Sequence, residues 1–179
     1  MILTGREIAR QHAAGRIHID PFHEDQLNPN SYNYRLGPVV KTYRPEVLDV
    51  ARPNEVETVT IPDDGMVLSP DRIYLGHTVE TMGSAHYVPI IRARSGIARL
   101  GLFVHVTADL IDIGSVNQWT LQLHAVQPVR VYPGLLIGQV TFWETTGEIT
   151  LYDGKYQHSQ GPAESQIHRD FRLLAGART

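Results

Sequence analysis

One stretch of this chain reads Arg94-Ser95-Gly96-Ile97-Ala98-Arg99-Leu100-Gly101, and it is followed by His105-Val106-Thr107-Ala108 and Ile111-Asp112. Two arginines stand five residues apart around a Ser-Gly step. Guanidinium groups bind phosphate oxygens bidentately, and a residue without a side chain lets backbone N–H groups approach them. The pattern therefore favours a nucleotide triphosphate site. The alternative interpretation is an exposed turn whose arginines are solvated.

Short runs of β-favouring residues surround this stretch, and Gly, Pro, Asn and Asp separate them. The runs cover residues 34–36, 56–61, 73–75, 87–91, 119–124, 129–132 and 137–142. Many short strands with regular turn signals predict a β-sandwich or a β-barrel.

The two ends of the chain and one internal segment differ from this β pattern. Thr4 followed by Glu7 forms a capping-box pattern, and a stop at Gly15 predicts one short N-terminal helix. Residues 44–64, with three prolines and several acidic residues, are interpreted as a loop or insertion. Residues 173–179 are interpreted as a frayed tail.

The bulk properties exclude several classes of protein. A length of 179 residues predicts a single domain, residues 1–179. A net charge of −3 argues against non-specific nucleic-acid binding. The absence of cysteine excludes thiol catalysis, thiolate zinc sites and disulfides. No window approaches the ~20 apolar residues of a membrane span, so we expect a soluble, cytoplasmic protein with no membrane partner.

These motifs resemble, in order, those of the dCTP deaminase branch of the trimeric dUTPase superfamily. Further matching segments are residues 1–8, 19–22, 31–37, 75–80, 133–139, 154–157 and 161–162. The resemblance implies a distorted β-barrel or jelly roll with a short N-terminal helix. It also implies a homotrimer with active sites between subunits, which act on a pyrimidine nucleotide.

The resemblance assigns roles to the first motif. It implies that Arg94 contacts phosphate, and that Ser95 holds the catalytic water together with the backbone carbonyl of Ala108. Arg99 is expected to orient the catalytic carboxylate and the phosphate. Thr107, in the His-Val-Thr-Ala motif, joins the nucleotide-binding set.

Further roles follow for residues after this motif. Asp112 matches an aspartate that touches the sugar hydroxyl in the deaminases and activates the attacking water in dUTPases; its alternative role is that of a turn former. His105 is either a structural histidine or a proton carrier. The resemblance implies that Tyr152, Lys155 and Tyr156 belong to a C-terminal segment, about residues 150–172, that closes over the triphosphate.

One departure from the family pattern concerns the proton shuttle. Family deaminases carry Thr-Leu-Glu-Leu-x-Asn, and the resemblance gives this glutamate the proton transfers of deamination. This chain reads Thr120-Leu121-Gln122-Leu123-His124-Ala125. Gln122 cannot titrate and cannot act as a general acid or base. His124 follows on the same face of the predicted strand, and it is the candidate substitute.

A second departure concerns the sugar. The resemblance implies an aromatic ring stacked on the deoxyribose three residues after Asp112, where this chain has Ser115. Residues 155–159 also lack a glutamine that the pattern places near the base. The phosphate-binding half is therefore retained while the base- and sugar-reading half has changed, and a ribonucleotide substrate becomes an open alternative.

Three functions remain open from the sequence. The first is a hydrolase that resembles dCTP deaminase but has altered specificity or an altered reaction. The second is a dUTPase-like nucleoside triphosphate diphosphatase that uses Asp112 and Mg²⁺ bound across the phosphates, although the glycine-rich C-terminal motif of dUTPases is absent. The third is a non-catalytic nucleotide-binding or regulatory protein. No protein-bound metal is expected, because the nine histidines lack ligand spacing.

Overall fold

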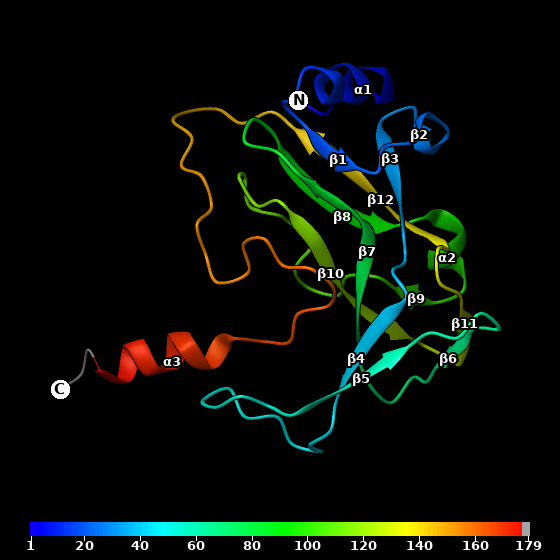
Figure 1. Ribbon diagram of the computed structural model, residues 1–179, viewed down its shortest axis with the longest axis vertical. Helices are drawn as coiled ribbons and strands as arrows, with labels where there is room; N and C mark the ends of the chain where they lie inside the picture. Colours follow the sequence, from blue (N-terminus) through cyan, green and yellow to red (C-terminus); the bar gives the residue numbers. More distant parts are fainter. Residues whose placement is uncertain (177–179) are drawn as a thin grey trace.

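A computed structural model describes residues 1–176 of the chain, with side chains described as far as residue 171 (Figure 1). The helices are α1 (Gly5–Ala13), the 3₁₀ turn η1 (Glu24–Gln26), α2 (Ser95–Arg99) and α3 (Ile167–Gly176). The strands are β1 (His18–Asp20), β2 (Leu27–Asn28), β3 (Ser31–Arg35), β4 (Val39–Tyr43), β5 (Val56–Thr60), β6 (Met66–Leu68), β7 (Tyr74–Gly83), β8 (Val88–Ala93), β9 (Leu102–Phe103), β10 (Asn117–Ala125), β11 (Val129–Val131) and β12 (Leu136–Trp143).

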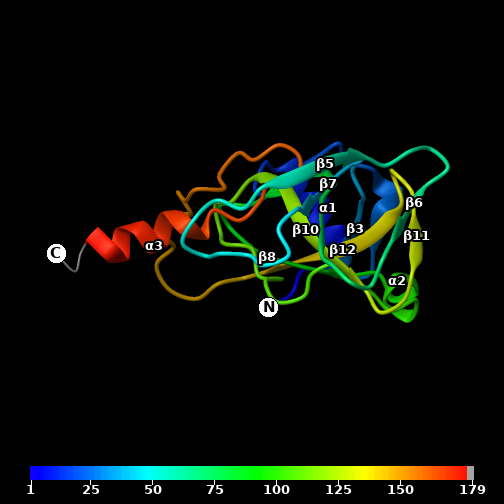
Figure 2. The ribbon, with the colours of Figure 1, turned by 90° about the horizontal axis from the view of Figure 1, so that it is seen from below.

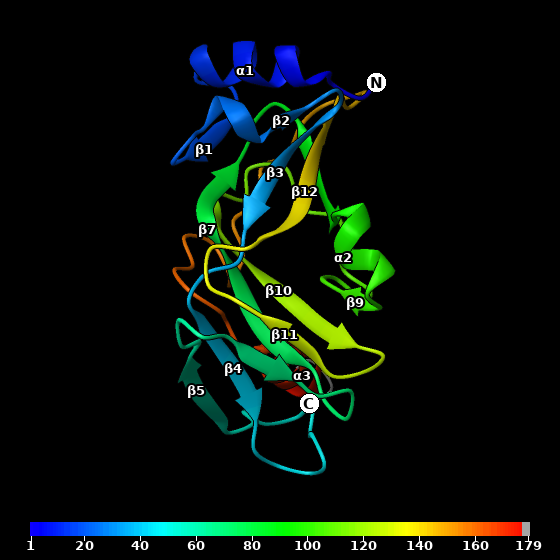
Figure 3. The same cartoon turned by 90° about the vertical axis from the view of Figure 1, so that its right-hand side faces the viewer.

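The strands form three sheets, and every pairing is antiparallel. The largest sheet has the order β5-β4-β7-β10-β9, with β1 pairing on β7; the second has the order β2-β3-β12-β8, and β11 pairs with β6. Figure 3 shows the long strands β7, β10 and β12 running through the middle of the molecule. The chain is mainly β with a short N-terminal helix, as the sequence predicts.

Strand β10 has the alternation of a half-buried strand. Its nine residues alternate between buried and partly exposed, and Trp119, Leu121 and Leu123 are buried in the core. Because successive side chains of a strand point to opposite faces, the other set, including Gln118, Thr120 and Gln122, shares the opposite face. This second face forms part of the site described below.

Helix α1 begins where the capping pattern predicts. The Thr4 hydroxyl accepts a hydrogen bond from the Glu7 backbone N–H at 3.4 Å, as an N-cap does. The Glu7 carboxylate pairs with Arg10 at 2.8 Å. Gly15 follows the helix with a φ of 71°, a left-handed conformation that favours glycine. The capping signal thus places the helix correctly.

Two of the sequence motifs pair directly in the second sheet. Tyr34 of β3 stands opposite Gly138 of β12 in the register. A Cβ added to Gly138 would lie 2.0 Å from the Tyr34 ring, so only glycine lets the two strands approach this closely. Both motifs therefore carry a packing requirement of the fold.

Two predictions of local structure were wrong in part. Residues 56–60 lie inside the predicted loop or insertion but form β5, as the β-favouring run 56–61 predicts. The strand pairs along β4, because Pro53 and Pro62 bracket it and leave its N–H groups free to pair. Residues 173–176 of the predicted frayed tail continue α3, and residues 177–179 lie outside the described residues. The Leu-Leu-Ala run of this helix has high helix propensity.

Helix α3 extends away from the sheets on the side of the molecule opposite to α2 (Figure 2). Among residues 1–176, no helix is both long and apolar enough to span a bilayer.

Candidate functional site

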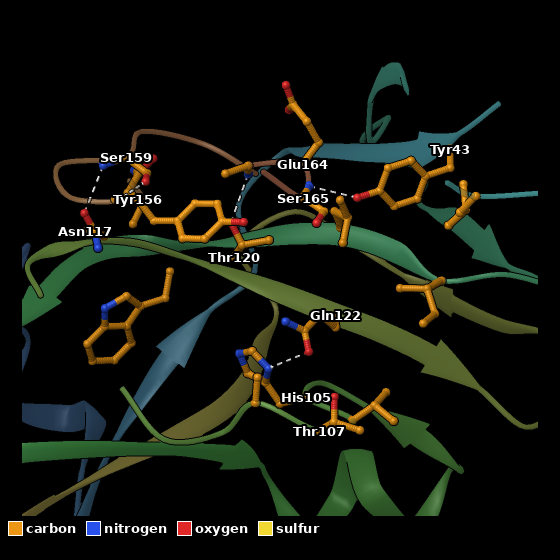
Figure 4. Close-up of a pocket in the computed structure, with 18 of the residues that line it drawn as sticks. Tyr43, His105, Thr107, Asn117, Thr120, Gln122, Tyr156, Ser159, Glu164 and Ser165 are labelled. Carbon is orange, nitrogen blue, oxygen red and sulfur yellow. Dashed lines mark hydrogen bonds between the residues drawn. The ribbon is translucent and has the colours of Figure 1, made fainter. Parts of the chain in front are cut away.

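A pocket of about 1060 Å³ opens on the partly exposed face of β10 (Figure 4). The loop from His105 to Ser115 forms one side, the segment after β4 forms another, and the C-terminal segment before α3 covers it. Candidate residues from the sequence that line the pocket are His105, Thr107, Ala108, Asp112, Ser115, Gln122, Tyr152 and Tyr156. Eight of the predicted residues thus meet in one cavity.

The C-terminal segment docks first on the loop that holds the Ile111-Asp112 motif. The Tyr152 N–H donates to the Ile113 carbonyl at 2.8 Å, and the Gln157 amide donates to the Gly114 carbonyl at 2.8 Å. Gly114 has a φ of 92°, and a Cβ there would lie 2.9 Å from the Tyr152 nitrogen. Glycine at this position is therefore needed both for the turn and for the approach of the segment.

The same segment then runs along β10. The Ser159 N–H donates to Asn117 Oδ1 at 2.9 Å, the Gly161 N–H to Gln118 Oε1 at 2.7 Å, and the Ala163 N–H to Thr120 Oγ1 at 2.9 Å. Side chains of the strand thereby bind the backbone of the segment at every second residue. This regular contact fixes the cover over the pocket.

The end of the cover is attached to strand β4. Tyr43 Oη accepts from the Ser165 N–H at 2.9 Å, and Lys41 Nζ lies 2.7 Å from Glu164 Oε2. The hydrogen bond with Lys41 lowers the pKa of the Glu164 carboxyl. Tyr43 and the residues after it line the pocket, so the segment interpreted as an insertion forms part of its wall.

His105 and Gln122 form a hydrogen-bonded pair inside the pocket. His105 Nδ1 lies 3.2 Å from Gln122 Oε1. Burial lowers the pKa of His105, which favours the neutral ring. An amide oxygen only accepts, so Nδ1 carries the ring proton and donates it to Gln122. His105 Nε2 is buried, and it has no hydrogen-bond partner among the described residues.

The arginine motif lies on a different part of the surface. Arg94, Ser95 and Arg99 are absent from the pocket lining. Arg94 precedes the short helix α2, and Arg99 Nη1 donates to the Ser95 carbonyl at 3.0 Å. A Cβ added to Gly96 would meet nothing within 4 Å. One chain by itself therefore does not bring the predicted phosphate-binding arginines to the cavity.

Two other candidates also lie outside the pocket lining. Lys155 forms an ion pair with Asp170 of α3, and its ammonium lies 5.8 Å from the centre of the Tyr156 ring. His124 does share a strand face with Gln122, but its ring lies 6.4 Å from the Phe103 ring. His105, rather than His124, is the histidine that contacts Gln122.

Ser115 is buried, with 7% of its surface exposed, and its hydroxyl accepts from Asn117 Nδ2 at 2.8 Å. The hydroxyl still has its own proton to donate. The site residues that sequence reasoning missed are Lys41, Tyr43, Asn117 and Glu164. The alternation of β10 does not indicate Asn117, which shares the parity of the buried residues of the strand, and the other three act through contacts between distant segments.

Within residues 1–176, no three His, Asp or Glu side chains are grouped so that they could hold a metal ion.

Comparisons with known proteins agree with this architecture. Residues 2–145 match the dCTP deaminase-like family model. A protein of Clostridium botulinum named "dCTP deaminase, dUMP-forming" is 44% identical over 172 residues, which cover 96% of this chain and 99% of the relative. A Leptospira biflexa protein of the same name is also 44% identical, over 96% of this chain and 98% of its own length.

The 2′-deoxycytidine 5′-triphosphate deaminase of Agrobacterium tumefaciens has a similar fold. Its crystal structure matches with a TM-score of 0.62 and 21% identity, over 79% of this chain and 47% of that chain. The sheets and the N-terminal helix described above, the family match and the near full-length relatives lead to one conclusion. The chain belongs to the dCTP deaminase-like family.

Proposed function

We propose that this protein hydrolyses a pyrimidine nucleoside triphosphate at a phosphoanhydride bond, and that it deaminates the base only very slowly. The relatives at 44% identity are named for converting dCTP to dUMP. That conversion replaces the amino group of the base and removes two phosphates. The two changes need different catalytic groups, so a chain of this family can keep one and lose the other.

The observation that carries the proposal is Gln122 on the floor of the pocket. Hydrolytic deamination needs a group that takes a proton from water and returns one to the leaving ammonia. An amide does neither at ordinary pH. Its neighbour His105 already uses the Nδ1 proton to bind Gln122, and the other ring nitrogen is buried. The base end of the pocket therefore lacks the carboxylate that the deamination requires.

Asp112 supplies the general base for hydrolysis of the phosphoanhydride bond. Its side chain is exposed, lines the pocket, and has no hydrogen bond or ion pair among the described residues. Of the other carboxylates in the lining, Asp71 pairs with Arg72 and Glu164 pairs with Lys41. Glu46 also has no hydrogen bond or ion pair among the described residues, and we choose Asp112 over it because Asp112 belongs to the Ile-Asp motif. Asp112 is thus available to take a proton from a water that attacks phosphorus, while pyrophosphate leaves.

The phosphates need positive charge that one chain does not bring to its pocket. The lining contains the cations Arg44 and Arg72, and each forms an ion pair with a nearby carboxylate. The partly exposed Arg94 and the exposed Arg99 are suited to complete the pocket of a second copy. We therefore propose a homotrimer in which these arginines and Ser95 enter the neighbouring subunit's site.

Mg²⁺ fits this proposal as an ion carried by the nucleotide. Mg²⁺ keeps several of its waters and binds largely through the substrate phosphates, so it needs no dedicated protein site and leaves Asp112 to act as the general base. Bound there, the ion would offset charge that develops on the phosphates.

The test is incubation with dUTP, dCTP, UTP and CTP in the presence of Mg²⁺, with products separated by mass. We expect nucleoside monophosphate and pyrophosphate, with no ammonia. Release of ammonia with an intact triphosphate would instead select deamination. Binding without any product would select the non-catalytic, regulatory alternative.

A further inference from the structure

The polar side chains of the pocket differ in how much of their hydrogen-bonding capacity is free. Gln118 uses both ends of its amide: Nε2 donates to the Val79 carbonyl at 3.0 Å, and Oε1 accepts from the Gly161 N–H. Asn117 likewise donates to Ser115 and accepts from the Ser159 N–H. These amides serve the structure of the pocket and have little left for a ligand.

Gln122 is the exception among the three amides of β10 that line the pocket. Its Oε1 accepts from His105 Nδ1, while its Nε2 has no hydrogen-bond partner among the described residues. Nε2 is not fully buried, so a ligand in the pocket can reach it. The contact with His105 holds the amide in one orientation, with its oxygen on the histidine and its N–H groups free.

Gln122 makes no hydrogen bond or ion pair to an arginine, a lysine or a carboxylate among the described residues. Its neighbours along the strand face are Thr120 and His124, and its hydrogen-bond partner is the partly buried His105, whose pKa is lowered by burial. The charge that acts on His105 is the negative carboxylate of Asp109. The cations of the lining, Arg44 and Arg72, belong to other segments of the wall. Phosphate groups need cations or many N–H donors. This end of the cavity therefore suits the base of a nucleotide better than its phosphates.

We propose that Gln122 selects the base of the substrate, and that His105 is the positioning residue that orients it for a pyrimidine whose facing edge carries a carbonyl oxygen. Uracil presents such an oxygen at C4, and cytosine presents an amino group there. The free Nε2 donates to the first and meets a second donor in the other. A buried donor without an acceptor is costly, so the mismatch penalises cytosine. This inference rests on the proposed binding of a pyrimidine triphosphate.

The test is calorimetric binding of the α,β-imido analogues of dUTP and dCTP to the intact protein, because these analogues resist cleavage of the bond in question. We expect the uracil analogue to bind at least about tenfold more tightly. Gln122→Leu removes the donor and should bring the two affinities close together. Gln127→Leu, the same change at an exposed position outside the pocket, should keep the preference.

His105→Phe tests the positioning role through the ratio of the two affinities, which a general loss of stability would not change. Without the Nδ1 donor the amide can present either end, so the uracil preference should fall while the variant still binds. Equal affinities for the two analogues in the unmodified protein would overturn this inference and leave the proposed function intact. Failure of both analogues to bind would overturn the proposed function, and this inference with it.

Discussion

The face of β10 and the α2 segment offer a contrast within one chain. Polar side chains on the first are covered by the C-terminal segment, accept hydrogen bonds from its backbone N–H groups and gather around a cavity. The Arg94 to Arg99 segment is largely exposed, and Arg99 contacts the carbonyl of its own helix. A base needs a shaped, uncharged cavity, and a triphosphate needs cations. In the proposed function, the two regions bind opposite ends of one ligand and are contributed by different copies of the chain.

Asp112→Asn should have the largest effect, because it removes the proposed base for attack on phosphorus. General-base catalysis is typically worth about 10²–10⁴-fold in rate. We expect kcat to fall by that factor with little change in nucleotide affinity, measured by pyrophosphate release and calorimetry. Asp153→Asn, an exposed neighbour outside the pocket, is the matched control. Unaltered kcat in the Asp112 variant would refute its role.

Arg99→Ala tests the other side of the comparison. A charge-assisted hydrogen bond contributes about 1.5–3 kcal/mol, so nucleotide binding should weaken roughly 10- to 150-fold. Arg130→Ala is the control, since Arg130 is exposed on β11, away from the pocket. Calorimetry of a folded variant that binds as well as the original would remove Arg99 from the site.

Mixing the two impaired variants, assayed at a nucleotide concentration too low to saturate Arg99→Ala, distinguishes sites within chains from sites between them. If Asp112 and Arg99 meet across subunits, co-refolded trimers of Asp112→Asn and Arg99→Ala chains contain some sites with both native residues. Random assembly in equal amounts predicts about a quarter of the original activity. Activity no higher than that of either variant alone would show that the site is built within one chain.

A smaller effect is expected for the sugar. Ser115 leaves room where the resemblance implies a stacked ring, and its hydroxyl retains a proton to donate beyond its contact with Asn117. Matched ribo- and deoxyribonucleotides should therefore bind within about tenfold of each other, or the ribo form should bind more tightly. A tenfold or greater preference for the deoxy form, in one preparation, would contradict this.

The smallest expected effect is on stability at mildly acid pH. Burial lowers the pKa of His105 below the value of about 6.5 that an unfolded histidine has. Below about pH 6.5 the unfolded chain binds more protons than the folded protein does. The stability is therefore fully present above this pH, and it is lost as the pH falls toward the pKa that His105 has in the folded protein. Between pH 7.5 and pH 5.5, the Tm of His105→Asn should fall less than the Tm of the unmodified protein. Equal declines would show that His105 does not contribute.

The sequence predicts local features of the fold and motif residues of the site better than long-range contacts. The Thr4 cap and the alternation along 119–124 depend on neighbouring residues, and both appear as expected. The attachment of the C-terminal segment through Tyr43 and Lys41 joins residues more than a hundred positions apart. No local pattern encodes such contacts. Likewise, the motif indicates that Arg94 and Arg99 bind phosphate, but not that they lie outside their own chain's pocket.

The most direct test of the account is ammonia release from dCTP by the unmodified protein and by Gln122→Glu. The substitution restores a titratable group of nearly the same shape at the floor of the pocket, next to His105. We predict very slow ammonia release from the unmodified protein, despite pyrophosphate release from a pyrimidine triphosphate, and clearly faster ammonia release from the variant. Rapid formation of uridine nucleotide by the unmodified protein would contradict the account, because another residue would then carry the protons.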